Sequence, residues 1–312
     1  MNMKALMTED NGDVIAEEHW AKRGDIDLYL YRKFPPSERA GNPDRGVLFL
    51  VHGSSFSART TYDLSVPGQG EYSVMNAFAR LGYDVWTIDH EGYGRSTHTD
   101  GFSYIADGVE DLKAAMPIVE KETGVSSYSF FGSSSGALRA GAFANACPER
   151  VSKLALAALV WTGKGSPTLL RRAERIDEWR ASNRRVVDEA AYRGIFSRDV
   201  EGLTIPELPA VVAAAEMANG GGSVPNGTYI DMCVNLPSMD PAKITCPVMI
   251  FRGDHDGIAT EEDLMGFYAA LPTKEKQIVM VSGQAHNTSL GINRHRFWHV
   301  LHGFLDTPDR LD

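Results

Sequence analysis

The residues with the clearest chemical potential form the run Gly-Ser-Ser-Ser-Gly at positions 132–136. The aromatic run at 128–131 predicts a buried strand before it, and the Ala-rich segment at 137–144 predicts a helix after it. Glycine at both ends of such a junction allows a turn so sharp that its central residue takes a strained backbone conformation. The turn therefore presents the hydroxyl of Ser134 as a candidate nucleophile, near the first N–H groups of a helix.

A serine hydroxyl is a weak nucleophile at neutral pH unless an imidazole takes its proton and a carboxylate orients that imidazole. Both groups follow Ser134 in the chain, each in a loop directly after a short apolar run: an acid at Asp256 and a base at His286. Asp254 lies two residues before Asp256, and residues at that spacing point to opposite sides of an extended segment, so only one faces the imidazole. Spacing alone leaves the choice between the two aspartates open.

A candidate site for binding the oxyanion of the reaction follows another apolar run, at residues 46–51, which ends in His52-Gly53-Ser54-Ser55. Small residues at the end of a strand allow a backbone N–H to point at a reacting carbonyl. Ser54 is the first choice for this donor and Ser55 the second. We expect His52 to be a structural hydrogen bonder beneath this loop.

The elements that must position these residues alternate along the chain. Extended segments at 14–20 and 26–31 flank a tight turn and predict an antiparallel hairpin, whereas 35–44 and 56–70 predict loops. Apolar runs then alternate with helical patterns, which predicts an α/β fold with a doubly wound, mostly parallel sheet. The predicted strands are 46–51, 84–89, 128–131, 151–160, 247–251 and 277–281, and the predicted helices are 71–81, 107–122, 137–144, 260–271 and 294–305.

Residues 162–240 break this alternation. They are charge-dense, with helical character at 169–187 and 211–217, three successive glycines at 220–222 and no buried-strand run. We expect a helical cap at 162–240, inserted into a core domain of residues 1–161 and 241–312, with residues 229–234 returning to the core. A separate domain is the alternative, but a stretch joined at both ends to strands fits an insertion better.

These motifs resemble the α/β-hydrolase superfamily over nearly the whole chain. Residues 132–136 resemble its nucleophile motif, 51–54 its oxyanion loop, 89–96 its D-x-x-G-x-G-x-S segment, 253–256 its G-x-x-D acid loop and 283–286 its terminal G-x-x-H. The resemblance implies that Ser134 is the nucleophile, Asp256 the acid and His286 the base. It also implies that the N–H groups of Ser54 and Ser135 form the oxyanion hole. Relatives such as haloalkane dehalogenases and epoxide hydrolases place aspartate where this chain has Ser134.

The leading functional hypothesis is hydrolysis of a carboxylic ester of a small to medium apolar or aromatic substrate through an acyl-enzyme. We expect Ser55, Phe56, Trp161 and Tyr229 to contact that substrate. The same triad also serves cleavage of a C–C bond in a β-diketone or ring-fission product, or of a lactone or amide, and these alternatives stay open. A receptor that binds a small molecule without turning it over is a further alternative.

Composition narrows the partners and the compartment. The 312 residues carry 31 Lys and Arg against 41 Asp and Glu, so the formal net charge of −10 disfavours nucleic acid and anionic membranes as partners. The three cysteines are widely spaced, and the first segment lacks an apolar stretch typical of a leader, which together favour the cytoplasm. We expect a small acyl substrate as the partner, with a homodimer as a further candidate, and no cofactor. His295, His299 and His302 share a helix face, but the aromatic residues around them favour packing over metal binding.

Overall fold

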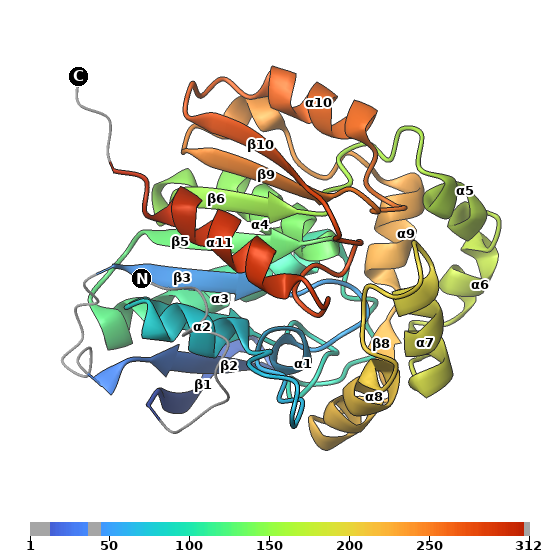
Figure 1. Ribbon diagram of the computed structural model, residues 1–312, viewed down its shortest axis with the longest axis horizontal. Coiled ribbons are helices and arrows are strands. Elements are labelled where there is room, and N and C mark those ends of the chain that lie inside the picture. Colours follow the sequence, from blue (N-terminus) through green and yellow to red (C-terminus); the bar gives the residue numbers. More distant parts are fainter. Residues whose placement is uncertain (1–12, 37–44, 309–312) are drawn as a thin grey trace.

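The computed structural model describes residues 13–36 and 45–308, shown as coloured ribbon in Figure 1. The first twelve residues and most of the loop predicted at 35–44 lie outside the described residues. No helix in the described ranges is both long and apolar enough to cross a membrane.

Eight strands of the described chain form one sheet in the order β1-β2-β4-β3-β5-β6-β9-β10. Strands β1 and β2 form the predicted antiparallel hairpin, β2 pairs antiparallel with β4, and the other neighbours pair in parallel. The fold predicted from the sequence is therefore confirmed. The strands are β1 (Ile15–Arg23), β2 (Ile26–Phe34), β3 (Val47–Val51), β4 (Asp84–Ile88), β5 (Tyr128–Ser133), β6 (Val151–Ala157), β9 (Val248–Gly253) and β10 (Lys276–Val281).

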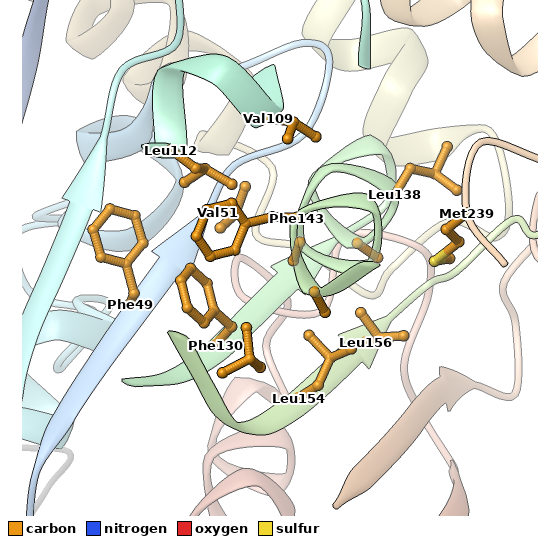
Figure 2. Close-up of a cluster of buried hydrophobic side chains, with 14 of the residues drawn as sticks. Phe49, Val51, Val109, Leu112, Phe130, Leu138, Phe143, Leu154, Leu156 and Met239 are labelled. Carbon is orange, nitrogen blue, oxygen red and sulfur yellow. The ribbon is translucent and has the colours of Figure 1, made fainter. Parts of the chain in front are cut away.

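Helices cover both faces of this sheet because alternate side chains of each buried strand point to opposite sides. In β3, Phe49 and Val51 belong to the apolar cluster that includes residues of α3, α4 and α10, whereas Leu48 and Leu50 belong to the one that includes residues of α2 and α11. Figure 2 shows the first cluster, where Phe130 of β5 meets Phe143 of α4. The covering helices are α2 (Val74–Arg80), α3 (Ile105–Thr123), α4 (Ser135–Ala146), α10 (Glu261–Ala270) and α11 (Arg294–Leu305).

Residues 162–240 run between β6 and β9, and their helices gather at the end of the sheet where the parallel strands finish (Figure 1). A third apolar cluster joins them to the loops of the sheet. It includes Tyr192 and Leu208 from this segment and Phe56 and Tyr93 from the loops. The elements are α5 (Pro167–Ala173), α6 (Ile176–Ala181), β7 (Arg184–Val186), α7 (Glu189–Ser197), α8 (Leu208–Ala218), β8 (Ser223–Pro225) and α9 (Gly227–Val234).

The structure corrects two local predictions. The helical stretch predicted at 169–187 is two short helices followed by β7, because β7 pairs with β8 about forty positions later, a contact that the local pattern does not contain. Residues 56–70, for which the sequence predicts a loop throughout, contain the short helix α1 (Ala58–Tyr62). Residues 227–234 form the helix α9, which packs on α5 and α6 and also contacts α3 of the core. The 3-10 turns η3 (Pro148–Arg150) and η4 (Pro241–Lys243) also lie among the described residues.

Candidate active site

Ser134 lies at the sharp turn between β5 and α4, where its φ of 57° falls in the left-handed region that non-glycine residues rarely adopt. The two flanking glycines make this turn sterically possible. A Cβ on Gly132 would overlap the carbonyl of Gly136, and a Cβ on Gly136 would overlap the carbonyl oxygen of Val51. Strain of this kind costs on the order of 1–3 kcal/mol and is found where a fold fixes a functional side chain.

The three side chains expected to act together lie within hydrogen-bonding distance of one another, although the chain separates them widely. Nε2 of His286 is 2.9 Å from Oγ of Ser134, and Nδ1 of the same ring is 2.8 Å from Oδ1 of Asp256. Ser134 follows β5, Asp256 follows β9 and His286 follows β10, so parallel strands bring all three to one edge of the sheet.

Asp256, and not Asp254, faces the imidazole. Oδ1 of Asp256 also accepts hydrogen bonds from the N–H groups of Ile258 and Ala259, at 2.8 and 3.0 Å. Burial opposes the charged form of this carboxyl, but His286 and the two N–H groups outweigh it, so the pKa of Asp256 is below its ordinary value. Asp254 is solvent-exposed, and its carboxylate accepts from the N–H of Gln284 instead.

His52 lies beneath the loop that carries Ser54. Its Nε2 accepts a hydrogen bond from the N–H of His90 at 3.1 Å, so Nδ1 carries the proton and donates to the carbonyl of Gly53 at 2.8 Å. Because the ring is fully buried and lies near His90, the pKa of His52 is well below its ordinary value and the imidazole is neutral. This neutral hydrogen bonder fixes the backbone directly before Ser54.

The loop after His52 is also bound from the side of residues 162–240. Arg185 donates to the carbonyl of Ser54 at 2.6 Å, and the hydroxyl of Tyr192 donates to the carbonyl of Ser55 at 3.2 Å. The side chains of Ser54 and Ser135 meet at 2.7 Å between their Oγ atoms. Ser135 is the first residue of α4, and N–H groups in the first turn of a helix have no acceptor within that helix. The backbone of the loop that carries Ser54 is therefore anchored, and Ser135 lies in the first turn of α4.

A cavity of about 50 Å³ borders Ser134 and His286. Ser55, Phe56 and Tyr229, which the sequence assigned to substrate contact, line it. Trp161 does not line this cavity, because its ring packs edge-on against Phe267 of α10 at 5.8 Å between centroids. The remaining lining residues mix apolar and polar side chains: Gly53, Ser54, Thr61, Ser133, Arg172, Ile195, Arg198, Met232, Ile258, Asn287, Ser289 and Leu290.

Two arginines in this lining, Arg172 and Arg198, were not anticipated from the sequence. Arg172 of α5 and Arg185 of β7 lie against the ring of Tyr229, each guanidinium 3.6 Å from the ring centroid. Burial opposes ionisation of the phenol, but these two cations outweigh it and lower the pKa of Tyr229 to about 7. The sequence does not reveal that these arginines surround a buried tyrosine, because arginines in a charge-dense stretch are usually solvated.

Asp199 is a further residue that the sequence did not indicate. Its Oδ2 accepts from the backbone N–H of His286 at 3.0 Å, and its carboxylate forms an ion pair with Arg198. Gly257, next to the acid, lies close to the same carboxylate, because a Cβ there would come within 2.7 Å of Oδ1 of Asp199. Residues 162–240 thus contact the backbone that positions both Asp256 and His286.

Within residues 13–36 and 45–308, no group of three or more His, Cys, Asp or Glu side chains has an arrangement that could bind a metal ion. Of the three histidines on α11, the ring of His302 packs edge-on against Tyr83. The geometry at Ser134, His286 and Asp256 can support nucleophilic attack with proton transfer through an imidazole.

Comparison with solved structures shows the same fold in hydrolases. 2-Hydroxy-6-oxo-6-phenylhexa-2,4-dienoate hydrolase from Rhodococcus sp. strain RHA1 is 16% identical, with a TM-score of 0.69 over 94% of this chain and 100% of that one. Carboxylesterase CesB from Bacillus subtilis is 15% identical, with a TM-score of 0.65 over 98% of this chain and 95% of that one. E-2-(acetamidomethylene)succinate hydrolase is 16% identical, with a TM-score of 0.65 over 94% and 100%.

No curated protein gives a sequence match. The family model described as serine aminopeptidase, S33, matches residues 43–290, which is most of the chain and includes Ser134, Asp256 and His286. The chain therefore belongs to the S33 serine aminopeptidase family of α/β-hydrolases.

Proposed function

We propose that this hydrolase cleaves carboxylic esters through an acyl-enzyme formed on Ser134. The observation that carries the proposal is the continuous hydrogen-bonded chain from Oγ of Ser134 through both nitrogens of His286 to Oδ1 of Asp256. Nδ1 points at a carboxylate that stays ionised because its pKa is lowered, so this nitrogen carries the proton and Nε2 is free to accept one.

In the proposed reaction, Oγ of Ser134 attacks the ester carbonyl as its proton passes to Nε2 of His286. The tetrahedral intermediate then expels the alcohol, which takes that proton, and leaves an acyl group on Ser134. Water attacks the acyl-enzyme while His286 takes one of its protons; the acyl–Oγ bond then breaks, Oγ of Ser134 takes that proton back from His286, and the carboxylic acid leaves. Asp256 stays ionised throughout and stabilises the imidazolium that forms in each half of the reaction.

The N–H groups of Ser54 and Ser135 are the proposed donors to the oxyanion. The anchoring of the loop that carries Ser54 supports this assignment: His52 fixes the backbone before Ser54, and Arg185 and Tyr192 fix the carbonyls around it. Donors that are fixed before the reaction need no reorganisation when the charge develops, and removing one such donor typically costs about 100- to 1000-fold in rate.

Residues 162–240 are proposed to form a cap over this site. Arg172, Arg198 and Tyr229 from this segment border the cavity at Ser134, and Asp199 contacts the backbone of His286. The small cavity favours a substrate of modest size.

An aminopeptidase reaction, which the family description suggests, would place a free ammonium group in the site. Arginines border the cavity and no described carboxylate does, which disfavours a cationic substrate.

The experiment compares the wild-type protein with Ser134→Ala on p-nitrophenyl acetate and butyrate. We expect turnover by the wild type and its loss in a variant that melts at the wild-type temperature. Undiminished turnover by Ser134→Ala would refute the assignment. A parallel panel of an amide, a lactone and a β-diketone separates ester cleavage from the C–C, lactone and amide alternatives, which use the same nucleophile.

A further inference from the structure

A second hollow, of about 420 Å³, adjoins the cavity at Ser134. Arg172, Ile195, Arg198 and Tyr229 border both spaces. Five arginines border the hollow, and no described aspartate or glutamate does. The arginines are Arg171, Arg172, Arg175, Arg185 and Arg198. The chain as a whole carries a net charge of −10, so this concentration of positive charge does not follow from its composition.

Most of these arginines are already engaged. Arg198 forms an ion pair with Asp199, and Arg175 forms one with Glu178 on the surface. Arg185 donates to the carbonyls of Pro225 and Ser54 at 2.7 and 2.6 Å. These three guanidinium groups therefore have partners within the protein and do not need a ligand to supply one.

Arg172 differs from the others. No described carboxylate lies within ion-pairing distance of it, and its Nη1 atom is buried without a hydrogen-bond partner among the described residues. Its guanidinium lies over the Tyr229 ring, 3.6 Å from the ring centroid, and this contact with a ring face does not use the N–H groups. Burial is the largest influence on this group and lowers the pKa of Arg172 below its ordinary value.

A buried cation without an anion is costly to the folded protein. A protein retains such a group when a ligand supplies the missing charge, because the ion pair then forms in a site of low dielectric constant. The planar fork of a guanidinium fits a carboxylate with two parallel hydrogen bonds. Of the five arginines, only Arg175 and Arg198 have a carboxylate partner among the described residues, so the junction of the two spaces favours an anionic group.

We propose that the substrate of this hydrolase is an ester that also carries a carboxylate, and that Arg172 binds this carboxylate. The inference rests on the proposed esterase function and names its substrate class. Arg172 and Tyr229 border both the cavity and the hollow, which places the carboxylate at their junction. The ester carbonyl then lies in the smaller space beside Ser134.

The first test uses the wild-type protein and pairs of esters that differ only in charge. Monomethyl glutarate and its neutral amide, methyl 5-amino-5-oxopentanoate, place the charge on the acyl side; 4-acetoxybenzoate and 4-acetoxybenzamide place it on the leaving group. We expect kcat/KM for the acid to exceed kcat/KM for the neutral amide by about 10- to 100-fold in at least one pair, which is the effect expected of a hydrogen bond between charged groups. Equal or lower values for the carboxylate in both pairs would overturn the inference while leaving the esterase function intact. No turnover of any of the four esters would count against both.

The second test changes the arginine. In Arg172→Met the ratio of kcat/KM for the acid to that for the amide falls toward one, and in Arg172→Lys, which keeps the charge without the fork, it is intermediate. Arg193→Gln is the matched control, because Arg193 pairs with Glu189 on the exposed surface of α7 and borders neither space. An unchanged ratio in Arg172→Met would overturn the proposal.

A competition assay supplies a readout that does not require these variants to fold. Glutarate should inhibit wild-type hydrolysis of the neutral ester competitively, and glutaramide at the same concentration should not. Inorganic phosphate tests whether the site prefers a phosphate group to a carboxylate. Stronger inhibition by phosphate than by glutarate, or equal inhibition by glutaramide, would contradict a carboxylate site.

Discussion

Replacing Asp256 with asparagine removes one charge from the site and leaves its hydrogen-bond acceptor in place. Oδ1 of Asp256 accepts from His286, Ile258 and Ala259, whereas Oδ2 has no hydrogen-bond partner among the described residues. In the Asp256→Asn variant the amide oxygen can therefore take the place of Oδ1, and the NH₂ group the place of Oδ2. The imidazole keeps its tautomer, and only the negative charge beside it is lost.

The size of the effect follows from that charge. Nδ1 and Oδ1 are 2.8 Å apart, which places the centres of the two delocalised charges about 4 Å apart. At an effective dielectric constant of about 20, their attraction is worth about 4 kcal/mol. The imidazolium forms only as Ser134 gives up its proton, so this energy is lost from the transition state. We expect kcat for a p-nitrophenyl ester to fall by about 1000-fold.

The assay is steady-state hydrolysis by purified wild type, Asp256→Asn and Asp254→Asn, with thermal melting as the check on folding. Asp254 is the matched control, because it is an exposed carboxylate two residues away that does not face the imidazole. We expect its removal to change kcat by less than about threefold, in line with the small energies of exposed charges. A loss below about tenfold in a folded Asp256→Asn variant would refute the electrostatic role assigned to Asp256.

Two further predictions concern the turn and the cap. Gly136→Ala should lower the free energy of unfolding by about 3 kcal/mol, because its Cβ would overlap the carbonyl oxygen of Val51 and come within 2.7 Å of that of His52. Gly303→Ala on α11 is the control, because a Cβ there meets nothing within 4 Å. Replacing this glycine with alanine should raise the free energy of unfolding by up to about 1 kcal/mol. Equal denaturant midpoints for the two variants would contradict this reasoning. Ultraviolet difference spectra should show one tyrosine ionising near pH 7. This transition should be absent in Tyr229→Phe and should move to higher pH in Arg172→Met, because removing a cation raises the pKa of the phenol. A titration that is unchanged in Tyr229→Phe would show that another group is responsible.

The sequence could predict the sheet and the residues at its edge because both depend on local patterns. A buried strand between helices is visible as an apolar run, and Gly132 is required by a clash within five residues. The clash that requires Gly136 is with Val51 of β3, so only the motif as a whole marks that position in the sequence. Ser134, Asp256 and His286 each follow such a run, so their meeting at the carboxyl ends of parallel strands follows from the fold.

The residues that shape the cavity from residues 162–240 could not be predicted in the same way. Arg172, Arg185 and Asp199 are ordinary members of a charge-dense stretch, and only packing against Tyr229, Ser54 and His286 gives them a role. The β7–β8 pair could not be predicted either, because it depends on a contact between segments that are distant in the sequence. Trp161 follows the end of β6, which favoured a place in the site, but its ring packs against Phe267, a choice decided by tertiary contacts.

The measurement that tests the central claim most directly is labelling with a fluorophosphonate, which captures only a serine activated by a neighbouring base. The account predicts one equivalent of adduct on the peptide that contains Ser134, with labelling lost in His286→Ala and in Ser134→Ala. An adduct on another peptide, or a folded protein that takes up no label, would contradict it.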